Sequence, residues 1–176
     1  MREVYTVRVD SRYVTSPSTD ASFVAFLNVP LQNVVRAELL SASIHPTSNA
    51  VSEAEVYVHV EELISKFVTR ATPIYQQAAA GLTSNISAVT QIVSNSGKLS
   101  EAFAALPVDL SLVDKSRVLY TSGNNFPTIT DYINPIRRLD KLTINLYNAS
   151  GTLLTTIGTS FFIFRFECAR DNSCLY

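Results

Sequence analysis

Hydrophobic and polar residues alternate with a period of two along most of this sequence, a pattern typical of half-buried β-strands. The clearest examples are residues 55–60 and 141–147. We expect their apolar members to face the core: Val56, Val58, Val60, Leu142, Ile144 and Leu146. Further strands are predicted over residues 3–9, 22–29, 34–44, 99–110, 116–121 and 161–168.

Two of these segments carry more information than the alternation itself. Residues 22–29 are apolar on both faces, which predicts a fully covered strand that ends at Pro30, because proline cannot donate to a β-ladder. Residues 161–168 place Phe162, Phe164, Phe166 and Cys168 on one face. We interpret this stripe as sheet core rather than as a ligand wall, because aromatics at period two pack on the opposite sheet.

The alternation is interrupted over residues 61–98, which we interpret as an insertion between strands. Within it, one helical stripe is formed by Leu82, Ile86, Val89 and Val93. No linker or repeat divides the rest, so we expect residues 1–176 to form one domain. The predicted fold class is all-β: a single jelly-roll β-sandwich of about eight antiparallel strands, with a helical insertion around 61–98.

Composition adds a hint of assembly. Charged residues make up 16% of the chain, against roughly 25% in soluble domains. Charge is depleted at the cores of interfaces, so the low content fits a subunit of an assembly as well as a Ser/Thr/Asn-rich β-protein surface. The formal net charge of −1 argues against direct nucleic-acid binding. No apolar run is long enough to span a membrane, and the first residues have no signal core, so we expect no secretion.

No catalytic constellation can be recognised in the sequence. His45 and His59 are the only histidines, and no nucleophile motif accompanies either of them. Glu61 and Glu62, at the end of a predicted strand, are expected to point to opposite faces. Asp109 and Asp114 flank a loop without a calcium pattern. We therefore expect that the protein is not an enzyme and that it has no catalytic residue, no metal site and no cofactor.

The remaining chemistry-bearing residues favour ordinary structural roles. Cys168 and Cys174 lack metal-ligand spacing and are expected to be buried or incidental thiols in a reducing compartment. The basic residues of note are Arg36, Arg70, Arg117, Arg137, Arg138 and Lys141. They suit either a phosphate or acidic-partner contact or, as we favour, a solvated rim.

The order of segments resembles that of a viral protein family. Residues 27–44, from Leu27-Asn28-Val29-Pro30 to Ser43-Ile44, resemble a stretch common in capsid proteins of large icosahedral double-stranded DNA viruses and virophages. His45 intervenes before the proline of the turn that follows. The second half resembles the later strands of a single jelly roll: residues 103–109 and 132–144, the turn at Gly151, and the closing strand Phe162–Cys168.

The resemblance implies a minor capsid protein located in the virion, most specifically the penton, which forms a homopentamer at each fivefold vertex. Its neighbours would be trimers of the major capsid protein and other minor capsid proteins. We expect its contacts on loops and on outward strand positions such as Tyr57, His59 and Tyr147. The alternatives are a cementing protein between trimers, a carbohydrate- or receptor-binding β-sandwich, and, last, an enzyme on the same fold.

Overall fold

Seven β-strands and two short 3-10 helices form the secondary structure. A computed structural model describes them over residues 2–14, 21–46, 55–64, 101–108, 118–123, 127–154 and 157–170. The elements are β1 (Arg2–Asp10), η1 (Ser11–Tyr13), β2 (Ser22–Pro46), β3 (Glu55–Val60), η2 (Glu61–Leu63), β4 (Ala104–Pro107), β5 (Val118–Thr121), β6 (Thr128–Tyr147) and β7 (Ile157–Ala169). No α-helix occurs among these residues.

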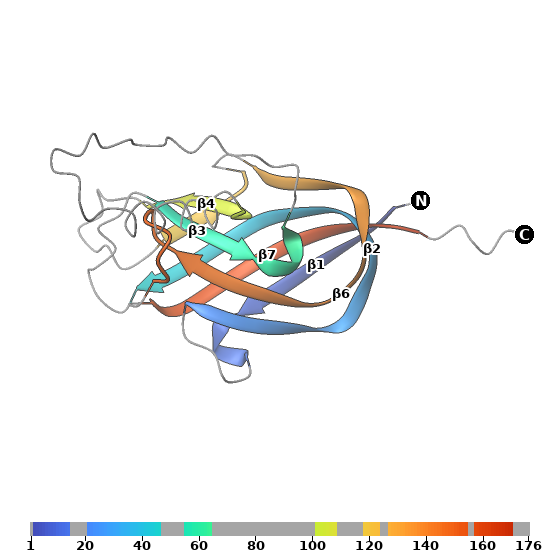
Figure 1. The fold of residues 1–176 in the computed structure, drawn as a ribbon. Helices are drawn as coiled ribbons and strands as arrows, with labels where there is room; N and C mark the ends of the chain where they lie inside the picture. The colour runs from blue at the N-terminus through green and yellow to red at the C-terminus, as the bar shows by residue number, and fades with distance from the viewer. Residues whose placement is uncertain are drawn as a thin grey trace, which may run out of the picture.

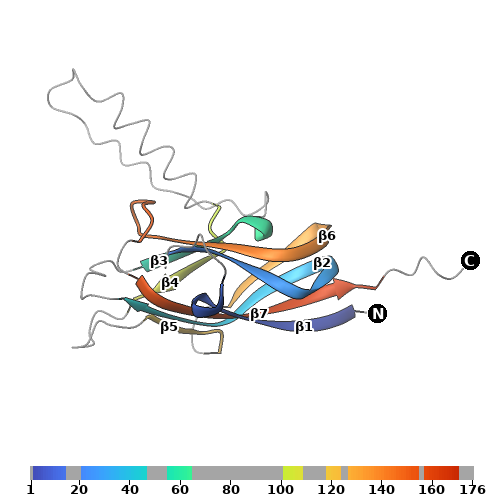
Figure 2. The same cartoon turned by 90° about the horizontal axis from the view of Figure 1, so that it is seen from below.

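The strands pair antiparallel in the order β1-β7-β2-β6-β3-β4, with β5 also paired to β2. β2 and β6 are long and curved, so each contributes to two layers (Figure 1). In the first layer, β1 pairs with β7, β7 with the second half of β2, and that half with β5 and the start of β6. In the second, the start of β2 pairs with the end of β6, followed by β3 and β4. Figure 2 shows both long strands running through the sandwich. This is the strand arrangement of a single jelly roll, and it confirms the predicted fold class.

The bend of β2 lies around Pro30. The pairing of β2 with β6 shifts register between Phe26 and Leu31, and again between Val34 and Arg36. A proline needs no ladder donor at such an interruption, so the strand continues through it. The prediction that Pro30 ends the strand is therefore wrong, and the segments predicted over 22–29 and 34–44 are one strand.

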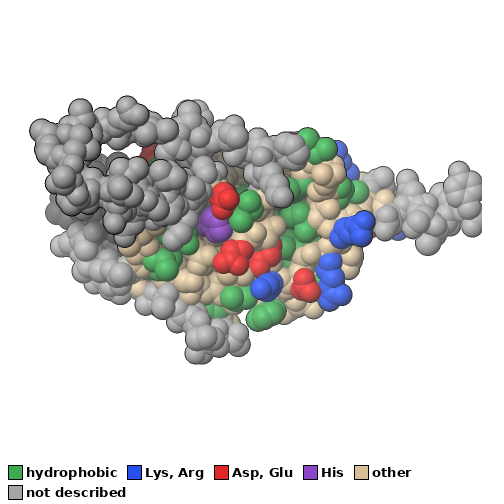
Figure 3. Space-filling model, in the orientation of Figure 1, with side chains coloured by type: hydrophobic (Ala, Val, Ile, Leu, Met, Phe, Trp, Pro, Cys, Tyr) green, Lys and Arg blue, Asp and Glu red, His purple; other side chains and the backbone are tan. Residues whose placement is uncertain are grey.

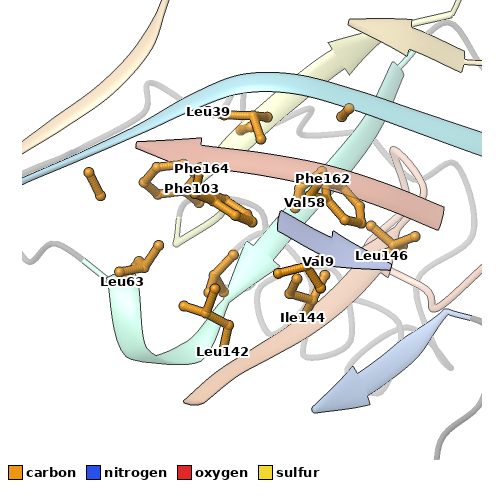
Figure 4. Close-up of a cluster of buried hydrophobic side chains, with 14 of the residues drawn as sticks. Val9, Leu39, Val58, Leu63, Phe103, Leu142, Ile144, Leu146, Phe162 and Phe164 are labelled. Atoms are coloured by element: carbon orange, nitrogen blue, oxygen red, sulfur yellow. The ribbon is translucent and has the colours of Figure 1, made fainter. Parts of the chain in front are cut away.

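Apolar side chains from both layers form a single core (Figure 4). Phe162, Phe164 and Phe166 stack along β7, with ring centroids 6.1 and 6.0 Å apart. Phe23 of the second layer lies 6.3 Å from Phe162 of the first, so the rings pack across the sandwich. Phe103, which precedes β4, lies 6.0 Å from Phe164. The phenylalanine stripe is sheet core, as predicted.

The alternation gave correct inward faces for β3 and for the end of β6, whose apolar residues are fully buried. It missed the first part of β6, because Ile129 and Ile133 are exposed there and Pro135 interrupts the run. The strand predicted over 99–110 is shorter, and forms β4. The helical stripe at 82–93 lies outside the described residues. Of the predicted insertion, residues 61–64 are described, and there η2 replaces a strand end.

Candidate assembly surfaces

A cleft of about 510 Å³ opens between the two layers where their edges meet. One wall is β1, with the inward side chains Tyr5, Val7 and Val9, and the other is the start of β2, including Ala25 and Leu27. We call this opening the layer-edge cleft. Its lining is mostly apolar, and Arg8 and Asp10 are the charged residues in it.

Both walls of the layer-edge cleft are sheet edges. Among the described residues, β1 pairs only with β7, and the first residues of β2, Ser22–Phe26, pair only with β6. Each strand therefore has one row of backbone N–H and C=O groups without a strand partner in the described part of the chain. Such an edge is a ready template for another chain. The sequence predicts a strand in each segment, but only the fold places the two strands on facing edges.

Large apolar side chains are exposed around the layer-edge cleft. Tyr13 is 81% exposed, Phe26 68% and Val29 70%, and all three belong to its lining. The expectation that residues 22–29 are covered on both faces is therefore wrong, because the outward face of this edge strand is open. Exposed apolar residues gathered at one opening indicate a contact surface.

A second exposed apolar pair lies at the opposite edge of the first layer. Leu119 of β5 is 56% exposed, and Ile129 at the start of β6 is also exposed. Within the described chain, β5 pairs only with β2, as does the start of β6, so these strands end the layer on that side. Their register partners on β2, Ser43 and Glu38, are five residues apart, so Leu119 and Ile129 are two separate points along one edge, which together we call the β5–β6 edge patch. The first layer thus carries two different apolar surfaces, one at each edge.

The outward face of β3 and β6 brings together the residues predicted to make contacts. Tyr57 and Tyr147 are register partners, and the rings of His59 and Tyr147 meet edge to face at 6.0 Å. His59 is 8% exposed and its Nε2 lies 4.0 Å from the carboxylate of Glu101. The pKa of Tyr147 is raised, chiefly because the phenol is partly buried and secondly because of the negative charge of Glu61. In Figure 3, acidic and basic side chains are interspersed over the described part of this face, as on a solvated surface.

The prediction that Glu61 and Glu62 point to opposite faces, as they would at a strand end, is wrong. η2 turns both toward β6, where Glu62 accepts hydrogen bonds from the backbone N–H and the Oγ1 of Thr143, at 2.6 and 2.7 Å. Glu61 accepts one from Nδ2 of Asn145 at 3.3 Å. Lys141 Nζ lies 3.8 Å from Glu62. These carboxylates therefore fasten the turn after β3 to β6, a structural role.

Ion pairs cross the outward face of the first layer. Arg36 lies 2.6 Å from Asp131 and 3.6 Å from Glu167, and Glu167 also pairs with Arg2 at 2.9 Å. The hydrogen bond from Arg36 lowers the pKa of Asp131. Arg165 pairs with the buried Glu38. Among the predicted basic residues, Arg36 and Lys141 are thus paired, Arg138 pairs with Asp140, and Arg137 is exposed. Arg70 and Arg117 lie outside the described residues.

No group of three His, Cys, Asp or Glu side chains that could hold a metal ion occurs in the described ranges. His45 is exposed at the end of β2, rather than in a loop, and contacts Ser43 at 3.3 Å. Cys168 is a buried thiol whose pKa burial raises, while Cys174, Asp109 and Asp114 lie outside the described residues. No helix in the described part of the chain is long and apolar enough to cross a membrane.

The sequence was compared with models of protein families and with curated proteins, and nothing matches it in either. Function is therefore argued from the fold and the two apolar edges.

Proposed function

We propose that this chain is a structural subunit of an icosahedral viral capsid, and specifically the penton, which forms a closed ring of five copies at each vertex. The observation that carries the proposal is the pair of apolar surfaces at opposite edges of one jelly-roll layer. The low charge of the sequence and its resemblance to capsid proteins support the same interpretation.

Two different surfaces suit a ring better than a twofold dimer. A twofold interface uses one self-complementary patch, whereas a ring needs each subunit to offer one patch and receive with another. The layer-edge cleft would receive, and the β5–β6 edge patch of the next copy, with Leu119, would insert. Neither Leu119 nor Ile129 brings a charge into the cleft, so the desolvation of ions there is limited to Arg8 and Asp10, which line it. Burial of apolar side chains would supply the association free energy.

The role in the particle is tested on purified particles from the source of this chain. The proposal predicts that the protein co-purifies with intact particles, at five copies per vertex, and that a density map fits five jelly rolls around each vertex. Absence of the protein from purified particles would refute a capsid role altogether. Density between major capsid trimers, with empty vertices, would instead identify a cementing protein.

A further inference from the structure

A second cavity lies on the outward face of the first layer and adjoins the layer-edge cleft, with which it shares Arg8 and Asp10. It measures about 390 Å³ and is lined by Arg8, Asp10, Arg12, Ser43, His45 and Phe161, among others. Alternation places these strand residues outward, because Val9, Ile44 and Phe162 between them are buried in the core. The end of β1, the end of β2 and the start of β7, which carry these residues, lie opposite the start of β1 and the end of β7 (Figure 1). We call this cavity the basic pocket.

The pocket is built from three adjacent strands held in register. Asp10 of β1 and Ser43 of β2 both face Phe161 of the central strand β7. η1 follows β1 directly and brings Arg12 to the rim. This places side chains that are distant in sequence on one row of the sheet.

The charges in the basic pocket do not cancel. Arg12 is held by Asp10, whose carboxylate accepts from its Nε at 3.0 Å and from its second guanidinium nitrogen at 2.6 Å. The Asp10 side chain is 7% exposed, so it lies beneath Arg12. Arg8 forms no ion pair with any described residue, and its guanidinium carbon lies 4.6 Å from the centre of the Phe161 ring. One guanidinium charge thus remains for a ligand.

This arrangement presents donors to a small anion. The N–H groups of a guanidinium lie in its plane. An aromatic ring covers one face of that plane, so the N–H groups can still donate to two oxygens of a carboxylate or sulfate. His45, which is exposed and whose Nε2 contacts Ser43 at 3.3 Å, adds an imidazole beside the guanidinium that can pair with a hydroxyl of a sugar. The carboxylate of Asp10 leaves a net charge of about +1, which suits a monoanion better than a doubly charged phosphate.

We propose that the basic pocket binds an acidic saccharide, meaning a sugar that carries a carboxylate or a sulfate ester. Arg8 holds the anionic group, and the residues around it contact the sugar. This is a recognition site on the outward face of the subunit. Because Arg8 also lines the layer-edge cleft, wild type and variants are compared at a concentration at which light scattering gives them the same assembly state. With one principal charged contact, a dissociation constant on the order of a millimolar is expected.

Saturation-transfer NMR, observed on the ligand, tests this proposal with the chain of residues 1–176. The method works for a monomer and for a ring. The probes are the methyl glycoside of N-acetylneuraminic acid, N-acetylglucosamine 6-sulfate, unmodified N-acetylglucosamine, and sodium sulfate as competitor. We expect a signal from the two acidic sugars, none from the neutral one, and only weak competition by sulfate. Arg8→Gln should weaken binding by about tenfold or more, since it removes a charged hydrogen-bond donor.

The matched control is Arg137→Gln, which removes an exposed arginine far from the pocket in the chain. It should bind as the wild type does, and circular dichroism should show both variants folded. Arg8→Lys keeps the charge without the planar fork and should bind with intermediate affinity. The proposal fails if neither acidic sugar gives a signal, or if Arg8→Gln and Arg137→Gln behave alike. It also fails if sulfate alone, or a short single-stranded oligonucleotide, competes as well as the sugars do.

Discussion

Replacing Phe164 by alanine tests the jelly-roll core where the two layers meet. The side chain is fully buried on β7. Its ring lies 6.1 Å from that of Phe162, 6.0 Å from that of Phe166 and 6.0 Å from that of Phe103. Phe103 precedes β4, at the edge of the second layer. The substitution therefore opens a cavity at a point on which several elements depend.

The expected loss follows from burial and ring contacts. Replacing a buried Phe by Ala removes apolar contacts and leaves a cavity. Such substitutions lower the free energy of unfolding by about 3–5 kcal/mol. Aromatic pairs contribute about 0.5–1.5 kcal/mol each beyond burial, and three pairs are lost together. Measured Phe-to-Ala losses already include such ring contacts, so with three pairs lost we expect Phe164→Ala to lie at the upper end of that range, about 4–5 kcal/mol. Phe164→Leu, which keeps most of the volume, should lose about 1.5 kcal/mol.

Urea unfolding measures the difference. Because the chain has no Trp, far-UV circular dichroism is the better signal. With a slope near 2 kcal/mol per molar urea, the midpoint for Phe164→Ala should fall by about 2 M. Ile133→Ala, at a 74% exposed side chain outside both apolar surfaces, is the control and should change stability by less than about 0.5 kcal/mol. A loss below about 1.5 kcal/mol for Phe164→Ala would refute the packing argument. All proteins are compared at one concentration, because assembly adds to apparent stability.

Three further substitutions test local features. Asn33 has φ of 52°, so Asn33→Ala should lose about 1 kcal/mol in urea unfolding while Asn33→Gly loses less; equal losses would contradict this. Glu62→Ala removes the acceptor of both hydrogen bonds from Thr143 and should lose about 1.5–3 kcal/mol in the same assay; no loss would show that the contact does not stabilise the fold. Burial raises the pKa of Tyr132, which donates to the Leu63 carbonyl, above its usual 10.0, so its contribution is complete below pH 10 and declines as the pH rises further. Tyr132→Phe should flatten that alkaline decline in a series of midpoints against pH, and an unchanged slope would exclude Tyr132 as its cause.

The fold was predictable where one face of a strand is buried and the other is open. β3 and the end of β6 alternate in sequence and in burial, so the inward residues Val58 and Ile144 could be assigned correctly. The first part of β6 lacks that signal, because its residues pack mainly at a layer edge. Pro30 marks an interruption of the ladder inside a long strand, and sequence alone does not distinguish this from a strand end.

The candidate surfaces were less predictable, because they depend on which edges meet. The sequence pattern of residues 3–9 and 22–29 predicts two strands, but it does not show that they face each other across a cleft. The apolar pattern on both faces of residues 22–29 is the one available signal, and it fits a covered strand as well as an exposed contact surface. The basic pocket combines Arg8, Ser43 and Phe161, residues that only the strand pairing makes neighbours. The outward positions of Tyr57, His59 and Tyr147 followed directly from alternation.

The most direct test of the proposed assembly is native mass by light scattering coupled to size exclusion, across a concentration series. The wild type is expected to form a pentamer, while Phe26→Asp in the cleft and Leu119→Asp in the β5–β6 edge patch should each remain monomeric. Ile133→Asp, which alters an exposed residue outside both surfaces, should assemble as the wild type does.

Mixing the two monomeric variants adds a sharper outcome. Each variant retains one intact surface, so one molecule of Phe26→Asp can pair head to tail with one molecule of Leu119→Asp, and no third molecule can be added. The mixture should therefore contain dimers but no rings. A wild-type protein that stays monomeric at every concentration, or that forms only twofold dimers, would contradict the account.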